Sequence, residues 1–160
     1  MGRRVPRQLL RWVGTLPLFS GHTAHQCARI LKLGTMLRVV QGTVLTDQGG
    51  PGDEVFVVVS GTARCERNGR CIAVFGPGDW FGEIAVLDRG PRTATVVAES
   101  PMELMVFGRR EFNAVLEESP RVARRMLPML AARTRRGGHA EGTVGARPPR
   151  GALDRRVSGA

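Results

Sequence analysis

EVFVVVSGTARCERNGRCIAVF, residues 54–75, is the stretch that decides the fold. Three strand-like runs are separated here by Gly61 and by Asn68-Gly69. An Asn-Gly pair between two such runs is typical of a type I′ hairpin, because both central residues of that turn need positive φ. We therefore predict strands over residues 54–60, 62–67 and 71–75, with a tight hairpin between the last two.

The same pattern continues on both sides of this stretch, from residue 36 to residue 108. Short apolar runs alternate with breaks that contain glycine. The further runs are 37–40, 43–45, 93–98 and 102–107, and the further breaks are Gly42, 49–52, 76–78 and 90–91. About eight short strands at this spacing predict a mainly β fold, an antiparallel double-sheet jelly-roll barrel.

Helical patterns flank the β region. Thr23 and Gln26 have the spacing of a capping box, which predicts the start of an N-terminal helix that Gly34 ends. After residue 108, apolar residues return at helical spacing. Ser119-Pro120 has the form of an N-cap followed by a first-turn proline, so we expect two C-terminal helices, the last of them kinked at Pro128.

These patterns divide the chain into a basic leader (1–13), one domain (14–136) and a tail (137–160). The tail is rich in Gly, Arg and Pro and has no periodic apolar face, so we expect it to be disordered. The net charge of +10 is concentrated in the leader, the tail and the last helix. This distribution favours a solvated basic surface over a nucleic-acid interface, and specific DNA binding is not expected.

One segment departs from an ordinary β pattern: FGEIAVLDRGPRTATV, residues 81–96. We expect a single helical turn over residues 83–87, inserted between two strands. Arg92 then stands at the entrance to the next strand, where a guanidinium can hold a phosphate with two hydrogen bonds. Glu83 offers an acceptor for a hydroxyl group. The pair predicts a ligand that has both a hydroxyl and an anionic phosphate.

This segment closely resembles the phosphate-binding cassette of cyclic-nucleotide-binding domains, as in catabolite activators and protein kinase A regulatory subunits. The resemblance implies that the ligand is cyclic AMP or, second, cyclic GMP. It implies that Glu83 accepts from the ribose 2′-hydroxyl and that Arg92 neutralises the cyclic phosphate. It further implies that backbone groups complete the ribose and phosphate site. The resemblance therefore assigns six ligand-binding residues: Gly82, Glu83, Ile84, Ala85, Arg92 and Thr93.

Two alternatives stay open at this site. Glu83 and Arg92 could pair with each other in an empty pocket, an arrangement that would say little about function. A hydroxyl such as that of Thr93, directly after the arginine, permits cyclic GMP without requiring it. Cyclic AMP is placed first only because it is the more common ligand of such domains in bacteria.

Other classes of site are not favoured by the sequence. The strands contain no histidine, so no metal or other cofactor is expected. Cys27, Cys65 and Cys71 form a small, odd set, which indicates a reducing, cytoplasmic location. No segment approaches the roughly 20 apolar residues of a membrane-spanning helix, so no membrane contact is expected. No catalytic motif is apparent, and we do not expect an enzyme.

The expected function is a sensor that signals to a separate effector protein when its last helix moves over the ligand as a lid. A transcription regulator would need a helix-turn-helix domain, and only 24 residues follow Arg136. The third alternative is a dimerisation module that binds no nucleotide. A homodimer through the last helix is compatible with the sensor as well.

Overall fold

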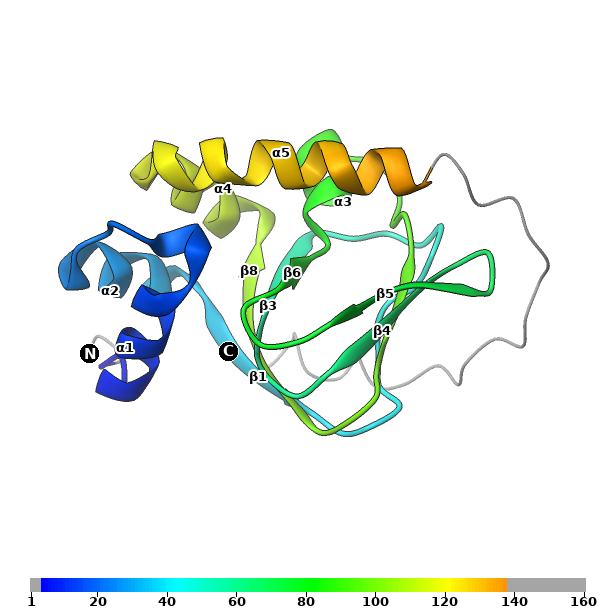
Figure 1. Ribbon diagram of the computed structural model, residues 1–160, viewed down its shortest axis with the longest axis horizontal. Helices are drawn as coiled ribbons and strands as arrows, with labels where there is room; N and C mark the ends of the chain where they lie inside the picture. The colour runs from blue at the N-terminus through cyan, green and yellow to red at the C-terminus, as the bar shows by residue number, and fades with distance from the viewer. Residues whose placement is uncertain (1–3, 138–160) are drawn as a thin grey trace.

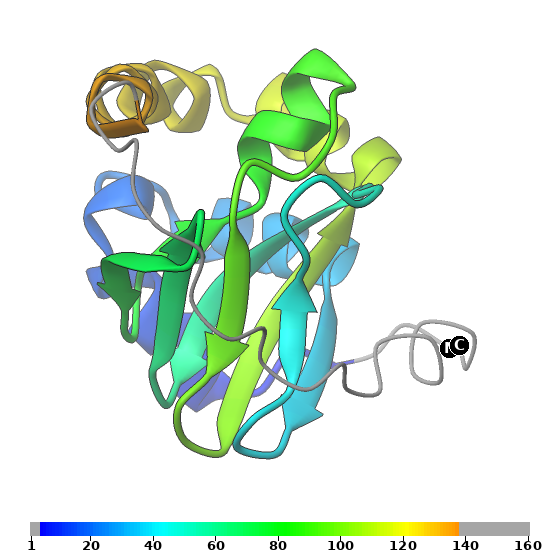
Figure 2. The ribbon, with the colours of Figure 1, turned by 90° about the vertical axis from the view of Figure 1, so that its right-hand side faces the viewer.

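The computed structural model describes residues 4–137. Eight strands within this range form two antiparallel sheets of four strands, with orders β1-β8-β3-β6 and β2-β7-β4-β5 (Figure 2). The prediction of a mainly β, double-sheet jelly roll is confirmed, although the described strands form two separate sheets and not a closed barrel. The strands are β1 Thr35–Val39, β2 Val44–Thr46, β3 Glu54–Ser60, β4 Ala63–Arg67, β5 Arg70–Phe75, β6 Trp80–Phe81, β7 Thr95–Ala98 and β8 Met102–Gly108.

The helices lie outside the two sheets. In Figure 1, α1 and α2 stand to one side of the strands, and α5 runs along one end of the fold past α4 and α3. Their bounds are α1 Arg7–Thr15, α2 Ala24–Leu33, α3 Glu83–Asp88, α4 Arg109–Glu118 and α5 Pro120–Gly137, with a 3-10 turn at Pro17–Phe19. The inserted turn predicted over residues 83–87 is α3.

Strand β3 shows why the fold has two cores. Its side chains alternate between two faces, and both faces are covered. Val55 and Val57 belong to the apolar cluster beneath the helices, whereas Phe56 and Val58 belong to the cluster between the sheets. Because both faces are buried, the strand reads as a continuous apolar run instead of an alternating one.

The β4–β5 hairpin follows the sequence prediction. Asn68 and Gly69 both have positive φ, at 51° and 76°, as a type I′ turn requires. Cys65 is opposite Ala73 and Cys71 is opposite Glu66, so the two cysteines are not cross-strand partners. All three cysteines are free thiols.

Two strand predictions need correction. Strand β6 was not foreseen, because a strand of two residues is too short to show a period. Strand β7 begins at Thr95 and not at residue 93. Arg92 therefore lies in the loop ahead of the strand, where its backbone exchanges hydrogen bonds with the 49–50 loop: its N–H donates to Gly50 O at 2.9 Å and its carbonyl accepts from Gly49 N–H at 2.8 Å.

Helix α1 crosses the boundary that we placed at residue 13 between leader and domain. Val13 is 2% exposed and packs in the core beneath the helices, while Arg7 and Arg11 face outward. The arginines made the apolar face of this helix difficult to recognise in the sequence. Part of the basic leader is therefore a helix that packs on the rest of the fold. Residues 138–160, which include nearly all of the expected tail, lie outside the described residues.

The predicted helix starts are confirmed. The Thr23 side chain accepts from the Gln26 N–H at 3.1 Å, and the Gln26 side chain accepts from the Thr23 N–H at 2.8 Å. The hydroxyl of Ser119 accepts from the Val122 N–H at 3.4 Å, at the start of α5. Pro128 lies inside α5, which continues past it to Gly137.

Candidate functional site

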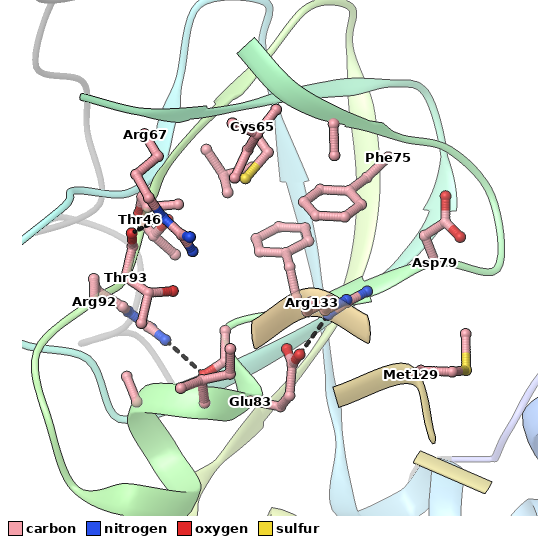
Figure 3. Close-up of a pocket in the computed structure, with 18 of the residues that line it drawn as sticks. Thr46, Cys65, Arg67, Phe75, Asp79, Glu83, Arg92, Thr93, Met129 and Arg133 are labelled. Carbon is pink, nitrogen blue, oxygen red and sulfur yellow. Dashed lines mark hydrogen bonds and ion pairs between the residues drawn. The ribbon is translucent and has the colours of Figure 1, made fainter. Parts of the chain in front are cut away.

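A cavity of about 320 Å³ lies between the second sheet, α3 and α5 (Figure 3). All six residues that the sequence assigned to the ligand line it: Gly82, Glu83, Ile84, Ala85, Arg92 and Thr93. They belong to the α3 segment and to the loop that leads into β7. The fold thus brings the predicted set together around one space.

Arg92 is the buried cation of this cavity, at 6% exposure. Its Nη1 donates to the carbonyl oxygens of Glu54 and Gly82, each at 3.0 Å. Burial lowers the pKa of Arg92 from its ordinary value, and the negative charges of Glu54 and Asp53 oppose that shift. The two carbonyls fix the side chain but do not neutralise it, and no carboxylate among the described residues lies within ion-pair distance of it.

Two glycines make room for this guanidinium. A Cβ on Gly52 would lie 1.9 Å from Nε of Arg92, far inside any possible contact. Gly82 has φ of +88°, and a Cβ there would lie 2.8 Å from Nη1 of Arg92. Gly82 was predicted as a site residue, whereas Gly52 was not, because only the folded loop places it against the arginine.

Glu83 is 1% exposed and pairs with Arg133 of α5, not with Arg92. The alternative of a Glu83–Arg92 ion pair is therefore wrong, since the two side chains are held by different partners (Figure 3). Arg133 also donates through Nη2 to the carbonyl of Trp80 at 2.5 Å, and its guanidinium lies 5.4 Å from the ring centroid of Phe75. This side chain connects the last helix to the floor of the cavity.

The wall opposite α3 is apolar. It is formed by β4 and β5, with Cys65, Ile72, Ala73 and Phe75 among its residues. The Phe75 ring stacks on Phe81 with centroids 5.2 Å apart. Burial raises the pKa of the Cys65 thiol to about 11. A flat apolar group can pack on this surface.

Sequence reasoning gave no role to Arg133 or to Arg67. Arg67 of β4 also lines the cavity, and its Nε donates to the carbonyl of Thr93 at 3.0 Å. Neither residue belongs to the 81–96 segment, and each reaches the site only because its element folds back over it. No local pattern marks them.

Between residues 4 and 137, no three His, Cys, Asp or Glu side chains converge as a metal site would require. None of the helices in that range has the length and apolar character needed to cross a lipid bilayer.

A cavity with a buried cation, a buried carboxylate and an apolar wall is typical of a domain that binds a small anionic ligand. Residues 36–119 match the family model described as "Cyclic nucleotide-binding domain". The chain belongs to the cyclic-nucleotide-binding domain family.

Relatives of known type agree with this assignment. The chain is 33% identical over 124 residues to the "Cyclic AMP receptor protein" of Thermus thermophilus, covering 74% of this chain and 57% of that protein. It is 32% identical over 116 residues to the "cAMP-dependent protein kinase regulatory subunit" of Aspergillus niger, covering 69% of this chain and 27% of that one. The chain thus spans little more than half, or less, of these relatives.

Among solved structures, the catabolite activator protein of Thermus thermophilus is similar with a TM-score of 0.70 and 32% identity. The similarity covers 76% of this chain and 60% of that one.

Proposed function

We propose that the cavity binds a 3′,5′-cyclic nucleotide, with cyclic AMP as the first candidate and cyclic GMP as the second. The observation that carries this proposal is the buried guanidinium of Arg92, which lines the cavity and has no carboxylate in ion-pair contact among the described residues. Burying a charge without an opposite charge is costly. A monoanionic cyclic phosphate would neutralise it, and this requirement selects an anion over a neutral ligand.

The neighbouring groups fit the rest of such a ligand. Ile84, Ala85 and Thr93 line the cavity close to Arg92 along the chain, and their backbone and hydroxyl groups are candidates to complete the phosphate site. Glu83 is a candidate acceptor for the ribose 2′-hydroxyl. The apolar wall of β4 and β5 suits the face of the base. Names of relatives that include cyclic AMP support placing that nucleotide first.

Helix α5 is the proposed signalling element. Arg133 joins it to Glu83, so a ribose hydroxyl that approaches Glu83 must share or replace this contact. Ligand binding would then shift the equilibrium between two positions of α5. The size of this shift is set by the difference in the ligand's affinity for the two arrangements. The output would pass to a separate effector protein through the exposed surface of this helix.

Calorimetric titration with cyclic AMP and cyclic GMP tests the proposal. Replacing Arg92 by Leu should cost about 2–5 kcal/mol of binding, roughly thirty-fold to several thousand-fold in affinity. Arg70→Leu is the matched control, because Arg70 is exposed on β5 and does not line the cavity. Equal affinities for the folded Arg92→Leu variant and the parent chain would refute the assigned role.

The two alternative functions, a transcription regulator and a dimerisation module, can be tested separately. A transcription regulator of the kind named among the relatives would show sequence-dependent DNA binding in a gel shift, which we do not expect.

A homodimer through α5 stays a prediction. Leu127 and Met129 on that helix are 63% and 44% exposed, and a second copy would cover them. Light scattering with and without nucleotide separates a sensor from a module that ignores the ligand.

A further inference from the structure

Arg67 is a second guanidinium in the cavity that the proposed phosphate site does not use. It belongs to β4, on the sheet opposite α3, whereas Arg92 reaches the cavity beside α3 (Figure 3). Its Nε is bound to the Thr93 carbonyl at 3.0 Å. Within residues 4–137, no other hydrogen bond or ion pair holds its two terminal nitrogens.

The position of Arg67 follows from the alternation of β4. Cys65 and Arg67 are two residues apart on this strand, so their side chains leave the same face. Cys65 is part of the apolar wall, and both residues line the cavity. Arg67 therefore stands at the edge of the surface on which the base of a bound nucleotide would pack.

The Thr93 carbonyl holds this side chain in place. A guanidinium anchored through Nε still has four N–H donors on its terminal nitrogens. Figure 3 shows the labelled Arg67 side chain extending into the cavity above Thr93. These donors form a planar fork, which matches two adjacent acceptors and has no acceptor of its own.

The geometry points to Arg67 as a specificity-determining residue that binds O6 and N7 of guanine or the O4 edge of uracil. This inference rests on the proposed cyclic-nucleotide function, and it places cyclic GMP or cyclic UMP ahead of cyclic AMP, the reverse of the order taken from the relatives' names. Guanine offers O6 and N7 as two adjacent acceptors, and arginine binds this pair with two hydrogen bonds. Uracil also presents carbonyl oxygens. Where guanine has O6 and uracil has O4, adenine and cytosine have an amino group, and a guanidinium, which only donates, cannot bind that group.

Arg67→Met tests this role, since methionine keeps an unbranched apolar stem and removes every donor. Arg70→Met is the control, because Arg70 pairs opposite Arg67 across the hairpin and does not line the cavity. Calorimetry would compare cyclic GMP, cyclic UMP, cyclic AMP and cyclic CMP on the parent chain and both variants. Thermal unfolding of each variant shows that it is folded.

The expected result is selective. Arg67→Met should weaken cyclic GMP or cyclic UMP by roughly five-fold to a hundred-fold and leave cyclic AMP and cyclic CMP within about two-fold. The comparison of cyclic GMP with cyclic UMP identifies which of the two bases the arginine fits. Arg70→Met should change none of the four affinities.

Three outcomes would overturn the inference. Equal losses for all four nucleotides would make Arg67 a phosphate contact, and no loss would make it a structural residue. A parent chain that binds cyclic AMP but neither cyclic GMP nor cyclic UMP would also refute it while leaving the proposed function intact. A folded parent chain that binds no cyclic nucleotide would refute the proposed function itself.

Discussion

The side chain of Arg92 packs directly on the backbone of Gly52, so closely that a Cβ on Gly52 would lie 1.9 Å from Nε. The same glycine-rich loop exchanges backbone hydrogen bonds with Arg92 through Gly49 and Gly50. The backbone of Arg92 and the middle of its side chain thus contact a loop about 40 residues earlier in the sequence. The proposed phosphate site depends on two segments, not on the 81–96 segment alone.

This packing predicts that Gly52→Ala displaces Arg92. The added methyl group should lower nucleotide affinity at least ten-fold, about 1.4 kcal/mol, in calorimetric titration. It should also destabilise the fold by roughly 1–3 kcal/mol through overpacking, measured by chemical denaturation. Gly76→Ala is the control, since a Cβ there meets nothing within 4 Å. Unchanged affinity in a folded Gly52→Ala protein would show that the arginine has room to move.

The Glu83–Arg133 contact predicts a coupled effect on stability. Arg133→Met should lower the free energy of unfolding by roughly 1–3 kcal/mol, because it leaves the carboxylate of Glu83 buried without its partner. The side chain of Arg133 is 23% exposed, so solvent screens part of the attraction. The double variant Glu83→Gln with Arg133→Met should recover part of the loss. Chemical denaturation of the four proteins measures this coupling, and strictly additive losses would argue against a direct interaction.

The sequence predicted the parts of the fold that local chemistry determines. Asn68-Gly69 specified the hairpin, Thr23 and Gln26 specified the start of α2, and the 81–96 segment contained all six assigned site residues. These features depend on residues close together in the chain, so the pattern is visible before folding.

The features that were missed depend on distant contacts. Arg133 meets Glu83 across 50 positions, and Arg67 meets Thr93 across 26. Gly52 has no special φ, and only the approach of Arg92 distinguishes it from other loop glycines. Strand β6 exists because Phe56 and Val57 of β3 pair with it, not because its own two residues have a pattern.

The cysteines should differ strongly in reactivity. Burial raises the pKa of Cys65 from 9.0 to about 11, which disfavours the thiolate, whereas Cys71 is exposed. At pH 8, a shift of this size leaves roughly a hundred-fold less thiolate than in an unperturbed thiol. Iodoacetamide should therefore modify Cys71 first, and the rate at Cys65 should keep rising until the pH approaches 11. Peptide mass spectrometry follows both sites.

A bound ligand adds a second test at Cys65, because this residue lines the cavity. Saturating nucleotide should slow its alkylation further without affecting Cys71. Comparable rates at the two cysteines at pH 8 would contradict the buried position of Cys65.

Pro128 divides α5 into two halves with different attachments. The first half is tied to the N-terminal segment, where Arg121 donates to Gly21 O at 3.0 Å and Arg125 donates to Pro17 O at 3.1 Å. The second half reaches the cavity through Arg133. Between them, Pro128 has no N–H to donate to the carbonyl four residues earlier, which weakens the helix at this point.

Replacing Pro128 by Ala should restore that hydrogen bond and stabilise the helix. Because Pro128 is exposed, little packing is lost, and the free energy of unfolding should rise by roughly 1–3 kcal/mol. Amide hydrogen exchange over residues 129–135 should slow by more than exchange over residues 120–127, since the first half is already anchored. Leu127→Ala is the control, being an exposed neighbour that already has its N–H. Uniform slowing along α5, or none, would show that the helix moves as one rigid piece and that Pro128 does not divide it.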